Sequence, residues 1–148
     1  MLSNMNFETG TVLIDGVEIG PGYSFHEFCK SPFYKQQDGI RTIPLEGIKY
    51  IDGNHYHISL CFREATICFV SLICCDKEFT KKTEYQRKEL HDQILTQYSI
   101  AGEKEFWWGK VTSEYDRRSN ISSIDLIYNI DPNTENTGTQ RTPRPAEN

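Results

Sequence analysis

Two histidines on one predicted strand are the residues of this chain whose type and spacing come nearest to a metal site. His55 and His57 are separated by one residue, so a strand would place both imidazoles on one face, and Cys61 follows on that face. His26 and His91 belong to separate predicted helices, and nothing in their spacing directs them inward. No third ligand is evident, so we expect a solvated strand face and keep His55 and His57 as the metal candidates.

A cysteine nucleophile would need a base within hydrogen-bonding reach. Cys61 lies four residues from His57 on the same strand, roughly 13 Å away at the usual rise per residue, so these two cannot react. Cys29 and His26 lie three residues apart on a short predicted helix and could meet, but no third group that would orient them is identifiable. With no complete catalytic constellation, we expect neither enzymatic activity nor a cofactor.

An aromatic run followed by a charged turn is the most informative cluster. Side chains alternate along a strand, so Trp107 and Trp108 should point to opposite sides, with one of them in the core. An exposed tryptophan near arginine has the composition of a protein-binding hot spot, and a sheet buried on both faces is the alternative. The candidate partner-binding residues are Trp107, Tyr115, Asp116, Arg117 and Arg118.

The first elements that the sequence predicts are a hairpin and a short helix. Within residues 11–19, Asp15-Gly16 stands between two β-branched runs, which is a strong indication of a tight hairpin turn. Ser24 and Glu27 then have the spacing of a capping box, so a helix should start there and end at Ser31-Pro32.

The middle of the chain predicts an antiparallel meander. In the strand that contains both candidate histidines, the even-numbered residues from Tyr56 to Phe62 should face the core, and the odd-numbered ones from His55 to Cys61 should face the other side. The predicted strands are residues 41–45, 48–51, 55–63 and 65–73.

A second helix and a second hairpin complete the domain. Thr83 and Gln86 have the spacing of another capping box, and an apolar stripe follows at Leu90, Ile94, Leu95 and Tyr98. The opposite face of this helix, with Arg87, Lys88, Glu89 and Asp92, should face solvent. Residues 105–115 and 121–130 should then pair as strands. The order of elements predicts an α+β fold, a mostly antiparallel sheet of six or seven strands with hairpins at both ends and two helices packed on it.

Length and composition favour a single domain. Within the 148 residues we place one domain at 5–130 and a disordered polar tail at 131–148, which lacks large apolar residues. Neither a secretory signal nor an apolar run long enough to cross a bilayer is present, so we expect a cytoplasmic protein. The five cysteines should be reduced core residues, and the alternative for Cys74-Cys75 is a redox-sensitive vicinal pair.

The charge of the chain favours a basic partner. The net charge is −5, and leaving out residues 131–148 removes three of the 21 acidic and two of the 16 basic residues, which gives −4. Nucleic-acid binders concentrate basic residues because phosphate neutralisation supplies most of their affinity, so we expect no direct nucleic-acid binding. A basic protein suits this acidic balance better.

Two segments carry a resemblance to a family. FWWGKVTSEYDRRSNISSIDLIY (106–128) and GVEIGPGYSFHEFCKSPF (16–33) cover less than a third of the chain. They resemble small bacterial proteins with an aromatic-Trp-Gly strand, a Tyr-Asp turn and a Ser-Ser-Ile strand, among which are immunity proteins of contact-dependent growth inhibition and other polymorphic toxin systems. The resemblance implies a cytoplasmic inhibitor of a toxin domain and carries over no binding residue.

The leading hypothesis is therefore an immunity protein that binds and neutralises a cognate bacterial toxin domain, for which a basic nuclease would suit the charge. The first alternative is a small enzyme or metal-binding protein that uses the His55/His57 face. The second is a structural adaptor subunit of a larger assembly, and edge strands of an open sheet would allow oligomers in either case.

Overall fold

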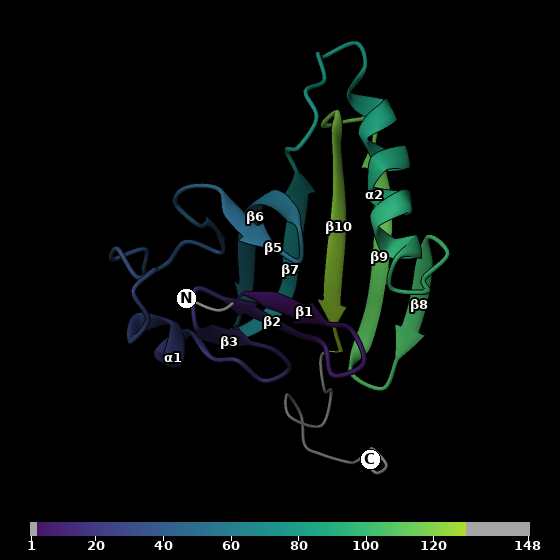
Figure 1. Ribbon diagram of the computed structural model, residues 1–148. Helices are drawn as coiled ribbons and strands as arrows, with labels where there is room; N and C mark the ends of the chain where they lie inside the picture. Colours follow the sequence, from purple (N-terminus) through teal and green to yellow (C-terminus); the bar gives the residue numbers. More distant parts are fainter. Residues whose placement is uncertain (1–2, 130–148) are drawn as a thin grey trace.

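The computed structural model describes residues 3–129, which form two antiparallel β-sheets and two α-helices (Figure 1). The smaller sheet has the order β1-β2-β3 and consists of β1 (Asn4–Asn6), β2 (Thr11–Ile14) and β3 (Val17–Ile19). The predicted α+β class is confirmed, although the N-terminal hairpin belongs to this separate sheet. The predicted tail at 131–148 lies outside the described residues.

The larger sheet has seven strands in the order β4-β6-β7-β10-β9-β8, with β5 also paired to β6. Every pairing in it is antiparallel, and the predicted hairpin at its C-terminal end is the β9–β10 pair. The strands are β4 (Thr42–Pro44), β5 (Lys49–Ile51), β6 (Asn54–Arg63), β7 (Thr66–Cys74), β8 (Glu103–Phe106), β9 (Gly109–Asp116) and β10 (Ile121–Tyr128).

Tight turns with two residues at positive φ join several strands. Asp15-Gly16 has φ values of 49° and 85°, and Asp52-Gly53 has 50° and 92°. This conformation matches the twist of the strands on either side, so the hairpin predicted at Asp15-Gly16 is confirmed. Glu64-Ala65 between β6 and β7 adopts the same left-handed conformation without a glycine.

The first helix, α1 (Phe25–Cys29), begins with the predicted capping box. Ser24 Oγ accepts a hydrogen bond from the Glu27 N–H at 3.0 Å, and the Glu27 carboxylate accepts one from the Ser24 N–H. The Phe25 N–H donates to the Ala65 carbonyl at 2.8 Å, which ties the helix to the β6–β7 turn. Phe28 is fully buried.

The second helix begins later than predicted. A 3-10 turn at Glu84–Gln86 precedes α2 (Arg87–Thr96), and no side-chain cap is formed by Thr83. Its hydroxyl instead accepts a hydrogen bond from the Thr80 N–H at 2.8 Å, so the predicted capping box is wrong. The apolar stripe is confirmed, with Ile94 and Leu95 buried and the two outer residues partly buried against the core.

Arg87 contradicts the predicted solvent face of this helix, and His91 points inward although nothing in its spacing indicated this. The Arg87 guanidinium lies 4.7 Å from the Phe79 ring centroid and donates to the Cys74 carbonyl. His91 is completely buried. Its Nε2 accepts a hydrogen bond from the Cys74 N–H at 3.0 Å, so the inward-pointing imidazole joins α2 to the end of β7.

Both α2 and the small sheet lie on the same face of the seven-stranded sheet (Figure 1). The Phe7 and Tyr98 rings meet edge to face at 4.8 Å, which joins the small sheet to the end of α2. The Trp108 indole N–H donates to the Phe7 carbonyl at 2.7 Å, and the Tyr128 hydroxyl donates to the Gly10 carbonyl at 2.7 Å. The hydrophobic core lies between these layers.

Candidate protein-binding surface

The seven-stranded sheet has a second face that neither α2 nor the small sheet covers, and we call it the open face. In antiparallel pairs, residues directly opposite each other share a face. On β6 the predicted alternation is confirmed, because Tyr56, Ile58, Leu60 and Phe62 are buried in the core while His55, His57 and Ser59 remain at least partly exposed on the open face. The register extends this assignment to the neighbouring strands.

One row of open-face residues crosses the whole sheet. Its central member is Asp125, which is partly buried, and its Oδ1 atom has no hydrogen-bond partner among residues 3–129. Burial raises the pKa of Asp125, and the Ser71 and Ser123 hydroxyls act in the opposite direction. In order across the strands, the row consists of Pro44, Ser59, Ser71, Asp125, Thr112 and Glu103.

Thr112, directly opposite Asp125, is also unsatisfied. It is 2% exposed, and its Oγ1 has no hydrogen-bond partner in the described part of the chain. The next residue, Ser113, points to the core face and has an equally unpaired hydroxyl. The two side chains therefore place the same kind of group on opposite faces of β9.

The part of the open face formed by β8, β9 and β10 is acidic. Lys110 is the one basic side chain that these three strands place there. The acidic side chains are Glu103, Glu105, Glu114, Asp116 and Asp125.

The part formed by β6 and β7 carries two thiols. Cys61 and Cys68 meet at a β-bulge with their Sγ atoms 3.2 Å apart. Burial and the neighbouring Cys61 raise the pKa of Cys68 to about 11, while the positive charges of Arg41 and Arg63 act to lower it. All five cysteines are free thiols, as predicted, but Cys75 and two others are only partly buried.

The metal candidates are only partly brought together. His55 and His57 both lie on β6, and His55 Nδ1 is 2.7 Å from Asp76 Oδ1. Residues 3–129 contain no group of three or more side chains arranged to hold a metal ion. The pair therefore forms an exposed polar edge in which His55 already has a carboxylate partner.

Trp107 and Trp108 form the turn between β8 and β9, so the single strand predicted over residues 105–115 is wrong at this point. One tryptophan is in the core, as predicted, and the other is exposed, so the alternative of a sheet buried on both faces does not hold for Trp107. Trp108 is 2% exposed, whereas Trp107 is 57% exposed and its indole N–H donates to the Glu8 carbonyl at 3.1 Å.

The other candidate partner residues lie at the far end of β9. The Tyr115 hydroxyl donates to Asn120 Oδ1 at 2.7 Å, and the Asp116 carboxylate accepts from the Arg118 N–H at 3.0 Å. Arg117 and Arg118 are exposed in the β9–β10 turn. The eight residues of β9 separate this turn from Trp107 by roughly 25 Å, so a partner that contacts both must cover the length of the strand.

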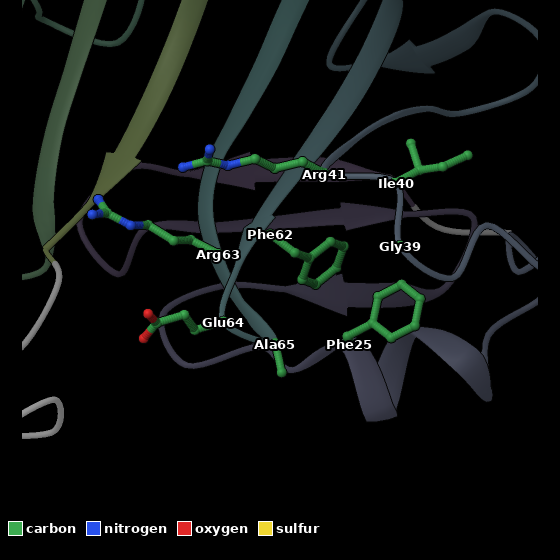
Figure 2. A pocket seen from close by; sticks show the side chains of 8 residues that line it. All are labelled: Phe25, Gly39, Ile40, Arg41, Phe62, Arg63, Glu64 and Ala65. Atoms are coloured by element: carbon green, nitrogen blue, oxygen red, sulfur yellow. The ribbon is translucent and has the colours of Figure 1, made fainter.

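A pocket of about 600 Å³ opens beside α1. Figure 2 shows Phe25, Phe62 and Ile40 around it, while Arg41 and Arg63 extend away in a common direction. Among the eight residues that line it, Glu64 is the one carboxylate, and none is a cysteine, serine or histidine. The pocket lining thus combines aromatic and aliphatic side chains with two arginines and a single carboxylate.

Comparison with solved structures finds a chain of the same overall fold. It belongs to a structure described as "Rhs1-CT in complex with cognate immunity protein RhsI1" and matches with a TM-score of 0.55 at 14% identity. The match covers 86% of this chain and 87% of that chain, so the likeness extends over the fold as a whole. No family model and no curated protein matches the sequence.

None of the helices among residues 3–129 is long and apolar enough to cross a membrane.

Proposed function

We propose that this protein is an immunity protein that binds and neutralises a cognate bacterial toxin domain in the cytoplasm. The observation that carries the proposal is the match over 86% of the chain to a chain of a solved complex with an immunity protein. An immunity protein performs no reaction, so it requires a rigid scaffold and a surface complementary to its toxin.

The acidic β8–β10 part of the open face supports the same proposal. A surface with an excess of carboxylates attracts a basic partner and accelerates the encounter with it. A seven-stranded sheet supplies a rigid platform for such a surface, because its strands are held by ladders of backbone hydrogen bonds.

The test is growth rescue together with direct binding. The domain encoded beside the gene for this protein is expressed in a sensitive strain with and without it, and the two purified proteins are mixed in a calorimeter. We expect growth to be restored and a complex of defined stoichiometry to form. Cells that die regardless, with no binding detected, would exclude an immunity role.

The enzyme alternative has a separate test. If the His55/His57 face held a catalytic metal, the purified protein would contain stoichiometric metal, and His57→Ala would abolish its biological effect. Because residues 3–129 contain no group of three or more side chains arranged to hold a metal ion, we expect no stoichiometric metal and unchanged growth rescue by the His57→Ala variant.

A further inference from the structure

Two residues of the open face that stand opposite each other, on β10 and β9, each carry a buried polar atom without a partner. Asp125 and Thr112 are directly opposite in the β10–β9 register, and neither Asp125 Oδ1 nor Thr112 Oγ1 has a hydrogen-bond partner among residues 3–129. Thr112 is 98% buried by its neighbours, since its exposed fraction is 2%. Burying such groups unsatisfied lowers the stability of the free protein.

The acidic side chains around Asp125 and Thr112 also lack ion-pair partners. The acidic side chains that β8, β9 and β10 place on the open face form no ion pair with a lysine, arginine or histidine in the described part of the chain. Their mutual repulsion adds to the cost of burying Asp125. A partner that carries positive charge would relieve the repulsion and would supply a hydrogen-bond donor to Asp125 Oδ1.

We propose that the β8–β10 part of the open face is the docking surface for a basic protein, and that a lysine or arginine side chain of this partner displaces the side chains covering Asp125 and Thr112 and binds between these two residues. The partner's N–H groups would donate to the Asp125 carboxylate and to Thr112 Oγ1. This inference rests on the proposed function, in which the basic protein is the toxin domain.

Other ligands fit the site less well. The acidic side chains repel phosphate, which disfavours a nucleic acid. A calcium ion takes six to eight oxygen ligands, and the described residues offer no cluster of three or more ligands here. A protein partner would also contact the partly buried Phe69, Ile73 and Ile127 on the same face, since interfaces combine apolar contact with a few charged groups.

Two variants and two matched controls test the inference against the purified domain encoded beside the gene. Asp125→Asn removes the charge, and Thr112→Val removes the hydroxyl at nearly constant shape. Ser113→Ala removes the equally unpaired hydroxyl on the opposite face of β9, and Glu89→Gln removes an exposed charge on α2. Dissociation constants are measured by calorimetry, and stability is measured by urea unfolding.

We expect Asp125→Asn to weaken binding by at least about 30-fold and Thr112→Val by roughly tenfold. The two controls should stay within about twofold of the unmodified protein. Both test variants should unfold at the same or higher urea concentration, because Asp125→Asn removes a charge that burial disfavours and Thr112→Val removes an unsatisfied buried hydroxyl. Weaker binding by a variant that is at least as stable as the unmodified protein could then not be attributed to misfolding.

The possible failures are distinguishable. If the unmodified protein binds tightly and both test variants bind equally well, the docking surface is elsewhere, and the proposed function stands without this inference. If Ser113→Ala weakens binding as much as Thr112→Val, the effect is transmitted through β9 and the inference is overturned. If the unmodified protein neither binds nor rescues growth, the proposed function fails, and this inference fails with it.

Discussion

At the scale of single residues, the buried histidine gives the protein a defined acid sensitivity. His91 accepts a backbone N–H with Nε2, so protonation would break that bond and place a charge in the core. Burial and the nearby Arg87 charge lower the pKa of His91 from 6.5 to about 4. In the unfolded chain the histidine takes up a proton near its ordinary pKa, and in the folded protein it does so only below about 4.

The expected result is a loss of stability as the pH falls from 6.5 to about 4, amounting to roughly 3 kcal/mol from this residue. Urea unfolding at a series of pH values measures it. In His91→Gln, the side-chain oxygen keeps an acceptor for the Cys74 N–H without titrating, so the variant should show a flatter profile. Parallel profiles would mean that His91 is protonated equally in both states.

The residue scale also shows where sequence reasoning stops. Period-two alternation on β6 correctly separated the histidines from the core, because burial of one sheet face follows directly from the pattern. Nothing in the sequence marks Asp125 or Thr112, since an acid and a threonine in a strand are ordinary surface residues. Their burial depends on neighbours brought in by β7, β8 and β10.

At the scale of elements, one glycine determines how closely β9 and β10 can pair. Gly109 has a φ of 151°, and a Cβ atom added there would lie 1.9 Å from the Ile127 carbonyl oxygen. We expect Gly109→Ala to destabilise the protein by at least about 3 kcal/mol, because backbone must move. Thermal unfolding followed by circular dichroism measures the loss.

Gly53→Ala is the matched control. Gly53 also has a positive φ, 92°, but an added Cβ would meet nothing within 4 Å. This variant should lose only about 1–2 kcal/mol, the cost of the left-handed conformation alone. Equal losses in the two variants would show that the contact with the Ile127 carbonyl is not decisive.

Rules that use only neighbouring residues predicted some turns and helix caps correctly and others wrongly. The Asp15-Gly16 turn and the Ser24 capping box were confirmed because each depends on neighbouring residues alone. The same rule failed at Thr83, where a hydrogen bond with the Thr80 backbone competes for the hydroxyl. The tight turn at Trp107-Trp108 carries no turn-forming residue before Gly109, so its composition predicts a strand.

At the scale of the whole molecule, the acidic surface should control how fast the partner arrives. If a basic toxin domain docks on the open face, the association rate should fall about tenfold or more between about 0.02 M and about 0.5 M NaCl, while the dissociation rate changes less. Stopped-flow mixing of the two proteins measures both rates. An association rate that does not change with salt would argue against electrostatic attraction.

The overall architecture was predictable in class but not in layering. The order of elements indicated an antiparallel α+β fold, yet the division into sheets of three and seven strands depends on contacts between distant segments. The five candidate partner residues were chosen from composition, and the structure places them at both ends of β9. Composition can suggest residue types that are common in protein interfaces, but it gives no information on which residues share a surface.

The bonds that hold the small sheet on the large one also set the order in which the protein can fold. Trp108 bonds to Phe7 across 101 positions of sequence, and Tyr128 bonds to Gly10 across 118. During synthesis the small sheet leaves the ribosome first but has nothing to dock on until β9 and β10 exist, and such distant contacts form slowly. If the protein acts as the proposed immunity protein, a nascent copy gives a cell no protection, and safety then depends on the molecules that finished folding earlier.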